Sequence, residues 1–349
     1  MMTGTTDAPA ATGATRRARG RGRMLGLGVS VLVLAVLCVL SIVVGSAMLP
    51  LDIVWHSFTD PDGSATQVTV TVARVNRTIL GLLVGAALGV SGALIQALTR
   101  NPLADPGILG VNAGAGFAVT LAVALLGVVR IDQYLPFAFA GAILASALVY
   151  LAAGTGRGSG SPVRLTLVGV AFAAVLTGFS HTLSLLDTST FARMRFWGAG
   201  TLADRPDGTV EAIIVPVAVG LVIAALCVRP LNALALGDES AQAVGVRLGA
   251  ARAGVVVAVA LLCGAATAAV GPLVFVGLVV PHAVRWLTGP DWVWITAYSA
   301  VLSPALLLGA DILGRLVAFP AELQVGVMLP LIGAPLLIAL VRGRRAKAL

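Results

Sequence analysis

The sequence predicts an all-α integral membrane protein with about ten transmembrane helices. Hydrophobic residues make up 58% of its 349 residues and charged residues only 11%, whereas a soluble domain carries about 25% charged residues. Uncharged apolar runs recur along the chain, and a helix needs about 20 apolar residues to cross the hydrocarbon core of a bilayer. Ten such helices would use about 200 residues, which leaves short loops and no room for a soluble domain.

The first span is expected at residues 25–49, an apolar run that follows an arginine-rich segment. Residues 1–24 contain Thr, Ala, Gly and Arg without an apolar period, which predicts a disordered cytoplasmic tail. A cleaved signal peptide is the alternative, because Gly45, Ser46 and Ala47 form a tolerable cleavage site. The apolar region of a signal peptide is only about 7–15 residues long, so a retained first span is favoured.

Nine further spans follow, so that residues 25–342 form one membrane domain of ten spans. They are expected at 76–98, 109–127, 135–153, 165–186, 211–228, 253–271, 273–281, 292–312 and 324–341. The span at 273–281 is short because Pro272 and Pro281 border it, and proline cannot continue a helix. The loops at 154–162 and 229–252 are then internal.

The external loops are expected at 50–73 and 188–210, the second with a short helix lying at the membrane interface. Basic residues accumulate in cytoplasmic loops, and 16 of the 23 basic residues lie in segments that this layout puts inside. The seven external ones are Arg74, Arg77, Arg130, Arg193, Arg195, Arg205 and Arg315. Both termini, including the tail at 343–349, are expected on the cytoplasmic side of the cytoplasmic (inner) membrane. The net charge of +8 is explained by this topology rather than by nucleic-acid binding.

The chain shows no catalytic constellation and is not expected to be an enzyme. A P-loop needs Gly-Lys followed by Ser or Thr, but the only lysine is Lys347, which lies between two alanines. Active transport would therefore take its energy from a separate ATPase subunit or from an ion gradient. A gradient-driven carrier usually has acids within its spans and an internal repeat. Here Asp187, Glu211 and Asp311 lie at span ends and no repeat relates the two halves, which counts against such a carrier.

No metal site or other cofactor is expected in this chain. Cys38, Cys227 and Cys263 all lie inside apolar runs, where they do not form a disulfide or metal framework. His56, His181 and His282 are far apart in sequence, and none has a second ligand at metal-binding spacing.

The second span combines a small-residue face with a sharp turn at its end. Gly81, Gly85 and Gly89 recur at every fourth residue, which puts them on one helix face where a neighbouring backbone can come close. Asn101, Pro102 and Pro106 follow the span and predict a turn, because proline ends a helix.

Four polar residues share one face of the fifth span, since they are spaced by three and four residues: Thr177, Ser180, His181 and Ser184. Polar groups in a span usually face the protein interior or a water-filled path. Interhelical hydrogen bonding and lining of a pathway are both compatible with this pattern.

Five stretches resemble, in order, the FecCD/BtuC-type permeases of type II ABC importers. The first runs from the arginines at 74 and 77 through LVGAALGVSGALIQ to TRNPLADPGILGVNAGA, and ends near residue 116. The others are LALGDESAQAVGV (234–246), GPLVFVGLVVPHAVRWLTG (271–289), GADILGR (309–315) and ELQVGVMLPLIGAPLLIALV (322–341). The resemblance covers roughly residues 50–342, and it implies the permease fold of these iron-siderophore, haem and vitamin B12 importers.

The resemblance implies a role for the internal loop at 229–252, because this segment docks on the ATPase in the family. Two short helices with a Gly turn fit its sequence. The residues expected to take part are Leu236, Gly237, Asp238, Glu239, Ala241, Gly245 and Arg247. The resemblance also implies that the fifth span lines the transport pathway.

The resemblance further implies that Arg74 and Arg315 meet acidic residues of a substrate-binding protein at the external face. The alternative is local, because Asp311 and Arg315 are four residues apart on one helix and can pair with each other.

The partners expected from the resemblance are those of a complete importer. The chain would form a homodimer, or a heterodimer with a paralogous permease, within membrane lipid. Two cytoplasmic ATPase subunits would bind ATP and Mg²⁺, and an extracytoplasmic binding protein would deliver the substrate. A ferric siderophore is the expected cargo, with cobalamin or haem as the alternative. A gradient-driven secondary carrier and a non-transporting membrane scaffold are the rival classes.

Overall fold

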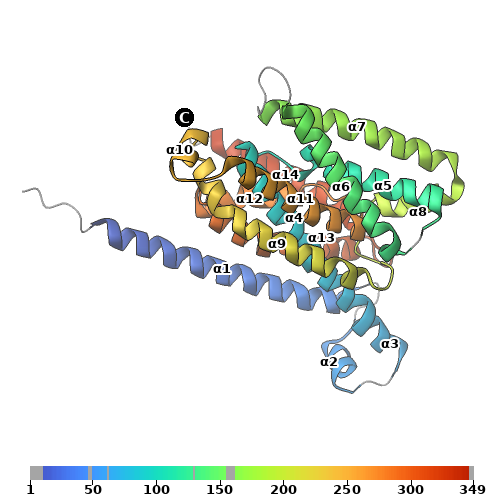
Figure 1. Cartoon of the computed structure of the whole chain (residues 1–349). Coiled ribbons are helices and arrows are strands. Elements are labelled where there is room, and N and C mark those ends of the chain that lie inside the picture. The colour runs from blue at the N-terminus through green and yellow to red at the C-terminus, as the bar shows by residue number, and fades with distance from the viewer. Residues whose placement is uncertain (1–10, 46–48, 61–62, 129, 155–161, 346–349) are drawn as a thin grey trace, which may run out of the picture.

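The computed structural model describes residues 11–45, 49–60, 63–128, 130–154 and 162–345, and every regular element among them is helical (Figure 1). The elements are α1 (Ala11–Val43), α2 (Leu51–Thr59), α3 (Ala65–Val68), the π-helix η1 (Thr69–Arg74), α4 (Val75–Thr99), the 3₁₀-helix η2 (Pro106–Leu109), α5 (Val111–Leu126), α6 (Ile131–Gly154), α7 (Pro162–Leu186), α8 (Thr188–Gly198), α9 (Thr209–Leu234), α10 (Asp238–Ala243), α11 (Leu248–Val270), α12 (Val276–Thr288), α13 (Trp292–Val317) and α14 (Val325–Arg345).

Seven of the described helices are long and apolar enough to cross a membrane. They are α1, the continuous helix from Ala65 to Thr99 that contains α4, and then α6, α7, α9, α11 and α13. Two shorter apolar helices, α5 and α14, and the 13-residue α12 match the remaining predicted spans. The all-α membrane fold that the composition predicts is confirmed.

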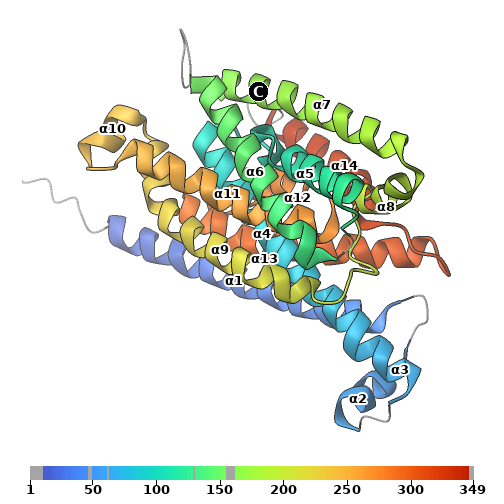
Figure 2. The same cartoon turned by 45° about the vertical axis from the view of Figure 1, so that its right-hand side comes forward.

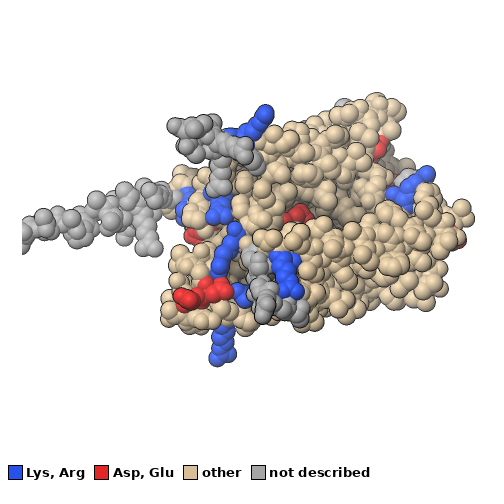
Figure 3. All heavy atoms as spheres, turned by 90° about the horizontal axis from the view of Figure 1, so that it is seen from above, with Lys and Arg blue, Asp and Glu red and all other residues tan. Residues whose placement is uncertain are grey.

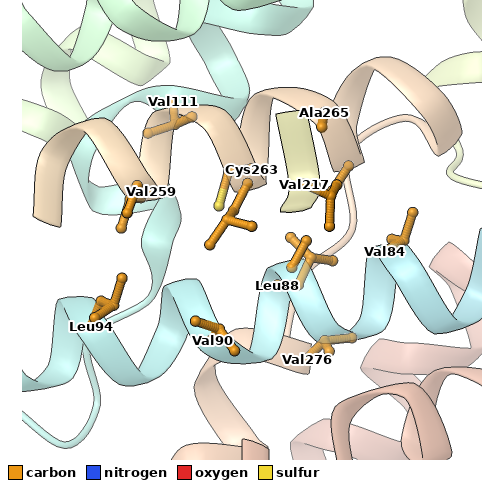
Figure 4. Packing of buried hydrophobic residues seen from close by; sticks show 14 of the residues in the cluster. Val84, Leu88, Val90, Leu94, Val111, Val217, Val259, Cys263, Ala265 and Val276 are labelled. Atoms are coloured by element: carbon orange, nitrogen blue, oxygen red, sulfur yellow. The ribbon is translucent and has the colours of Figure 1, made fainter. Parts of the chain in front are cut away.

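The core lies around α4, which is enclosed by α13, α11, α12 and α9. In Figure 4, α4 and α11 run side by side and their apolar side chains interdigitate. The labelled residues from α4 are Val84, Leu88, Val90 and Leu94, and those from α11 are Val259, Cys263 and Ala265. In its apolar stretch, the long helix that contains α4 is 78% buried, whereas the apolar stretches of α1 and α7 are only 11% buried. These two helices flank the bundle on opposite sides (Figures 1 and 2).

Two expectations for the first part of the chain are wrong. α1 begins at Ala11 rather than after residue 24, because alanine and arginine are good helix formers that extend the apolar helix backwards. The expected loop at 50–73 is largely helical, and its last part continues into α4 without a break. Residues 1–10, the loop residues 155–161 and residues 346–349 lie outside the described part of the chain.

The expectation that Pro281 ends the eighth span is also wrong, because α12 continues through it to Thr288. A proline inside a helix leaves the carbonyl four residues earlier without its helical partner. That carbonyl belongs to Gly277, and it lies against Gly92 of α4, where no side chain intervenes. Nearby, Gln96 Nε2 of α4 donates to the carbonyl of Leu278 at 3.0 Å. The turn of α12 that precedes Pro281 is thus in close contact with α4.

Candidate functional site

An ion-pair cluster lies at the end of the bundle that is expected to be external. Arg77 of α4 forms two hydrogen bonds with Asp311 of α13, from Nε to Oδ2 at 2.9 Å and from Nη2 to Oδ1 at 2.7 Å. It also donates to Glu322 at 2.6 Å. Arg315 donates to Asp311 Oδ2 at 2.5 Å, and both of these side chains are 1% exposed. Asp311 and Glu322 together balance the charges of the two arginines, and the contact between Arg77 and Asp311 has the bidentate geometry that makes such pairs strong.

Two arginines at the same end hold the last turn of α1. Arg74 Nη1 donates to the carbonyls of Ile42 at 2.7 Å and Val43 at 2.8 Å. Arg315 Nη1 donates to the carbonyls of Ser41 at 2.8 Å and Val44 at 2.5 Å. The last carbonyls of a helix lack intrahelical partners and carry a partial negative charge. The two guanidinium groups supply both the hydrogen bonds and the positive charge.

Arg74 and Arg315, which were expected to meet a binding protein at the external face, lie at that end of the bundle and line its cavity, but little of their surface is exposed. Both residues are buried, at 6% and 2% relative exposure. The local pairing of Asp311 with Arg315, the alternative weighed above, is the one that the structure contains. The hydrogen bonds from these arginines to the end of α1 were not predicted, because the sequence does not show where the end of α1 lies relative to α4 and α13.

A cavity of about 510 Å³ opens beside this cluster. Its walls come from the start of the long helix at 69–80, the segment 202–211 before and into α9, and residues 320–322 before α14, together with Gly45 and Arg315. Arg77 and Glu322 have side-chain exposures of 12% and 27%. They are the members of the cluster that retain some contact with solvent in front of the buried pair.

The four polar residues of the fifth span divide into two groups. Ser180 and Ser184 bond to their own helix, donating to the carbonyls of Leu176 and Ser180 at 2.8 Å each. Thr177 and His181 lie on the exposed surface of α7, whereas Ser184 is buried. The four side chains therefore do not form one exposed surface. Only those of Thr177 and His181 are exposed, where they could contact a pathway or a partner.

The glycines of the second span lie against α13. A Cβ atom at Gly81 would be 2.5 Å from Leu308, one at Gly85 2.4 Å from the Cα of Pro304, and one at Gly89 2.0 Å from Ser303 Oγ. Gly92, which the sequence analysis did not single out, is tighter still against α12, at 1.8 Å from the carbonyl oxygen of Gly277. The sequence could have indicated Gly92, because it follows Gly89 by three residues, a spacing that keeps two residues near the same side of a helix.

The internal connection between α9 and α11 is shorter than the expected loop. α9 continues to Leu234 and α11 begins at Leu248, so one short helix, α10, occupies the connection where two were expected. The glycines on either side of α10, Gly237 and Gly245, have φ of +113° and +84°, which residues with a side chain adopt at a cost. α10 lies at the opposite end of the bundle from α2 and α3 (Figures 1 and 2).

The residues next to α10 form an apolar surface that the described part of the chain leaves exposed. Leu236 and Val244, which flank the helix, are 78% and 72% exposed, while Ala241 between them is fully buried against the bundle. Glu239 and Arg247 are exposed as well. Figure 3 shows that charged side chains on the face it presents gather mainly towards the α10 end.

Asp238, the first residue of α10, joins three elements. Its Oδ1 accepts a hydrogen bond from Arg100 Nη2 at 2.5 Å and its Oδ2 accepts one from Arg252 Nη2 of α11 at 2.6 Å. Partial burial would raise the pKa of Asp238, but the two arginines outweigh it and hold the pKa below the usual value. Asp238 is therefore ionised at neutral pH, and it loses these ion pairs only as the pH falls through that lowered pKa.

The predicted turn at Asn101, Pro102 and Pro106 connects α4 to two other helices. Asn101 Oδ1 accepts from the backbone N–H of Leu103 at 3.0 Å, and the carbonyl of Pro102 lies 3.1 Å from His282 Nδ1 of α12. Asp105 accepts from the N–H of Gly107 and begins η2, and Pro106 packs against Gly277. The segment thus turns back into the bundle after the end of α4.

A model of the FecCD transport family matches residues 33–343 of this chain. The chain is 47% identical over 309 residues to the ferric enterobactin transport system permease protein FepD of Escherichia coli (strain K12), covering 88% of this chain and 92% of that protein. It is 37% identical over 318 residues to the iron(3+)-hydroxamate import system permease protein FhuB of Bacillus subtilis (strain 168), covering 89% and 82%.

A solved structure has the same architecture. It is described as an inward-facing conformation of a metal-chelate type ABC transporter, and it superimposes with a TM-score of 0.79 at 26% identity. The similarity covers 91% of this chain and 98% of that one.

Proposed function

Because the chain belongs to the FecCD transport family, we propose that it is the transmembrane permease subunit of an ABC importer for a ferric siderophore. The 47% identity to a ferric enterobactin permease, over most of both chains, carries the proposal for the cargo. The importer would lie in the cytoplasmic membrane with both termini inside. Cobalamin and haem are the alternative cargoes, since permeases for both resemble this chain in its motifs.

The exposed face of α7 supports a second permease copy as partner. Large apolar side chains lie uncovered along this helix, among them Leu167, Phe179 and Leu185 at 66%, 59% and 74% exposure. Lipid or a second permease would cover such a surface. In the proposed dimer the cargo crosses between the two copies, past Thr177 and His181.

The energy for this transport would come from ATPase subunits that attach at α10. Leu236 and Val244 offer apolar contacts on the internal side, where a partner can bury them. At the other end, a binding protein would dock over the cavity beside Arg77 and Glu322. The Nη1 atoms of Arg74 and Arg315 bond the end of α1, and both residues line the cavity over which the partner would dock.

The function is tested by uptake in a strain that lacks its own ferric-siderophore, haem and cobalamin permeases. The chain is expressed with its ATPase and binding protein, and uptake of ⁵⁵Fe-labelled catecholate and hydroxamate chelates, haem and labelled cobalamin is measured. We expect uptake of an iron chelate that stops when the ATPase is inactivated and persists when the ion gradient is collapsed. Uptake of cobalamin or haem alone would overturn the cargo, and uptake that needs only the gradient would overturn the class.

Replacing Leu236 or Val244 with aspartate is expected to weaken ATPase binding at least tenfold, because buried apolar anchors at an interface contribute about 2 kcal/mol or more. The folded permease should be recovered in normal amount, since neither side chain packs in the bundle. Co-purification of the ATPase measures the effect. Arg285→Gln, a change on α12 at the same end, serves as the control, and equal ATPase recovery from all three variants would remove α10 from the interface.

Cysteine labelling tests the lining assigned to α7. With Cys38 changed to serine, Thr177→Cys and His181→Cys are expected to react with a water-soluble maleimide in the assembled importer. Val175→Cys is the control, because it lies on another face of the same helix and is 54% exposed in the single chain. Similar labelling at 175 and 177 would show that the reagent reports general access and not a polar pathway.

A further inference from the structure

Arg100 occupies the junction between α4, α9 and α10. It is the residue that ends α4, with φ of +51° in the left-handed region. Its Nε donates to the carbonyl of Leu234 at the end of α9 at 3.0 Å, and its Nη2 donates to Asp238 at the start of α10. The planar guanidinium can bond in two directions at once, which a lysine ammonium on its flexible stem does not reproduce.

The segment that follows Arg100 touches α12 and α7, the helix that is proposed to line the pathway. The carbonyl of Pro102 faces His282 of α12, and Pro106 packs against Gly277 of the same helix. Ile108 lies so close to α7 that a Cβ at Gly169 would be 1.6 Å from its carbonyl oxygen. A displacement of Arg100 would therefore also move the few residues after it, which contact both α12 and α7.

Asp238 forms ion pairs with Arg100 and Arg252, and the pair with Arg100 joins residues that are farther apart in the sequence. Arg252 is 14 residues from Asp238 in sequence, and the chain already ties α10 to α11 covalently through residues 244–247. Arg100 is 138 residues away. Within the described part of the chain, the ion pair formed by Asp238 and Arg100 links α10 directly to the end of α4.

We propose that Arg100 is a positioning residue for transport: through Asp238 it couples movement of α10 to the segment 101–110 and so to α7 and α12. The proposal rests on the proposed function, in which ATPase subunits act on α10. When α10 moves, the ion pair carries the end of α4 and the turn after it. Without the pair, α10 moves and the turn stays.

If the ion pair between Arg100 and Asp238 served only to stabilise the fold, its loss would lower transport only through a loss of stability. The side chains of Arg100 and Asp238 are 45% and 42% exposed, and exposed ion pairs contribute little to stability. Loss of the pair should leave the folded protein nearly as stable as before. A large loss of transport at normal stability is therefore the signature of coupling rather than of folding.

The experiment compares Arg100→Gln with Arg252→Gln in the complete importer reconstituted into proteoliposomes. Both changes remove one arginine from the same carboxylate, so Asp238 keeps one partner in each. The measured quantities are ATP hydrolysis, uptake of the transported iron chelate, and the thermal midpoint of the purified complex. We expect Arg100→Gln to lower the amount transported per ATP about tenfold, with hydrolysis within about twofold of the unmodified importer. Arg252→Gln should keep the normal ratio.

The conservative variant Arg100→Lys separates charge from geometry, and it should recover only part of the ratio because lysine lacks the rigid guanidinium whose two nitrogens bond Leu234 and Asp238. An equal ratio in Arg100→Gln, Arg252→Gln and the unmodified importer would overturn the coupling proposal. So would a loss of transport matched by a lowered thermal midpoint in Arg100→Gln alone. If the unmodified complex neither hydrolyses ATP nor takes up an iron chelate, the proposed function itself is rejected, which is a distinguishable result.

Discussion

Replacing Asp311 with alanine is expected to lower the free energy of unfolding by about 3–5 kcal/mol, the usual cost of breaking a buried ion pair from one side. Asp311 accepts two hydrogen bonds from Arg77 and one from Arg315. Its removal leaves Arg315, 1% exposed, with an uncompensated charge. The grip of Arg315 on the end of α1 should loosen as well. Little folded protein should be recovered from membranes.

The measurement is thermal unfolding of the detergent-purified subunit, followed by size-exclusion chromatography. Glu322→Gln is the matched control, because it removes an acid that bonds the same Arg77 but is 27% exposed, and it should cost much less. The competing account is a docking role for this cluster. It would predict that Asp311→Ala folds normally and loses only affinity for the binding protein, and that outcome would refute the stability assignment.

Replacing Gly92 with valine is expected to be nearly as damaging. A Cβ at this position would lie 1.8 Å from the carbonyl oxygen of Gly277 and 2.6 Å from its Cα. Backbone atoms cannot move aside as a flexible side chain can, so α4 and α12 must separate. The cost should exceed the usual overpacking penalty of about 1–3 kcal/mol.

Gly309→Val on α13 provides the control for this substitution. Gly309 is also in a spanning helix, but nothing lies within 4 Å of the position where its Cβ would be. Its thermal midpoint and yield should stay close to those of the unmodified protein. Equal destabilisation by the two valines would mean that the β-branched residue, and not the close approach of two helices, is responsible.

The fold could be predicted from sequence because its strongest determinants are local and repeated. Apolar runs of membrane length give the spans, and the four-residue spacing of Gly81, Gly85 and Gly89 gives the face of α4 that approaches α13. Glycine punctuation predicted two short helices in the internal connection, and one of them, α10, is present between the two glycines with positive φ. In each case the information is contained within one or two turns of the chain.

The candidate site could be predicted only in part, because its side chains bond to residues far away in sequence. The bonds of Arg74 to the carbonyls of Ile42 and Val43 were not predicted, because the position of these carbonyls depends on how α1 packs. The link between Arg100 and Asp238 was missed for the same reason. Pro281 was read as a helix end, because the sequence does not reveal that Gly92 leaves room for the carbonyl that proline frees.

The pairing of Arg77 with Asp311 also constrains the order in which the protein can assemble. The two residues are 234 positions apart, so α4 leaves the ribosome long before α13 exists. Until α13 has been synthesised, Arg77 lacks its partner Asp311, and an unpaired arginine is best solvated at the membrane surface. The central helix of the finished bundle can therefore settle at its final depth only late in synthesis. A truncated chain that ends before α13 should leave that helix shallow and open to quality-control proteases.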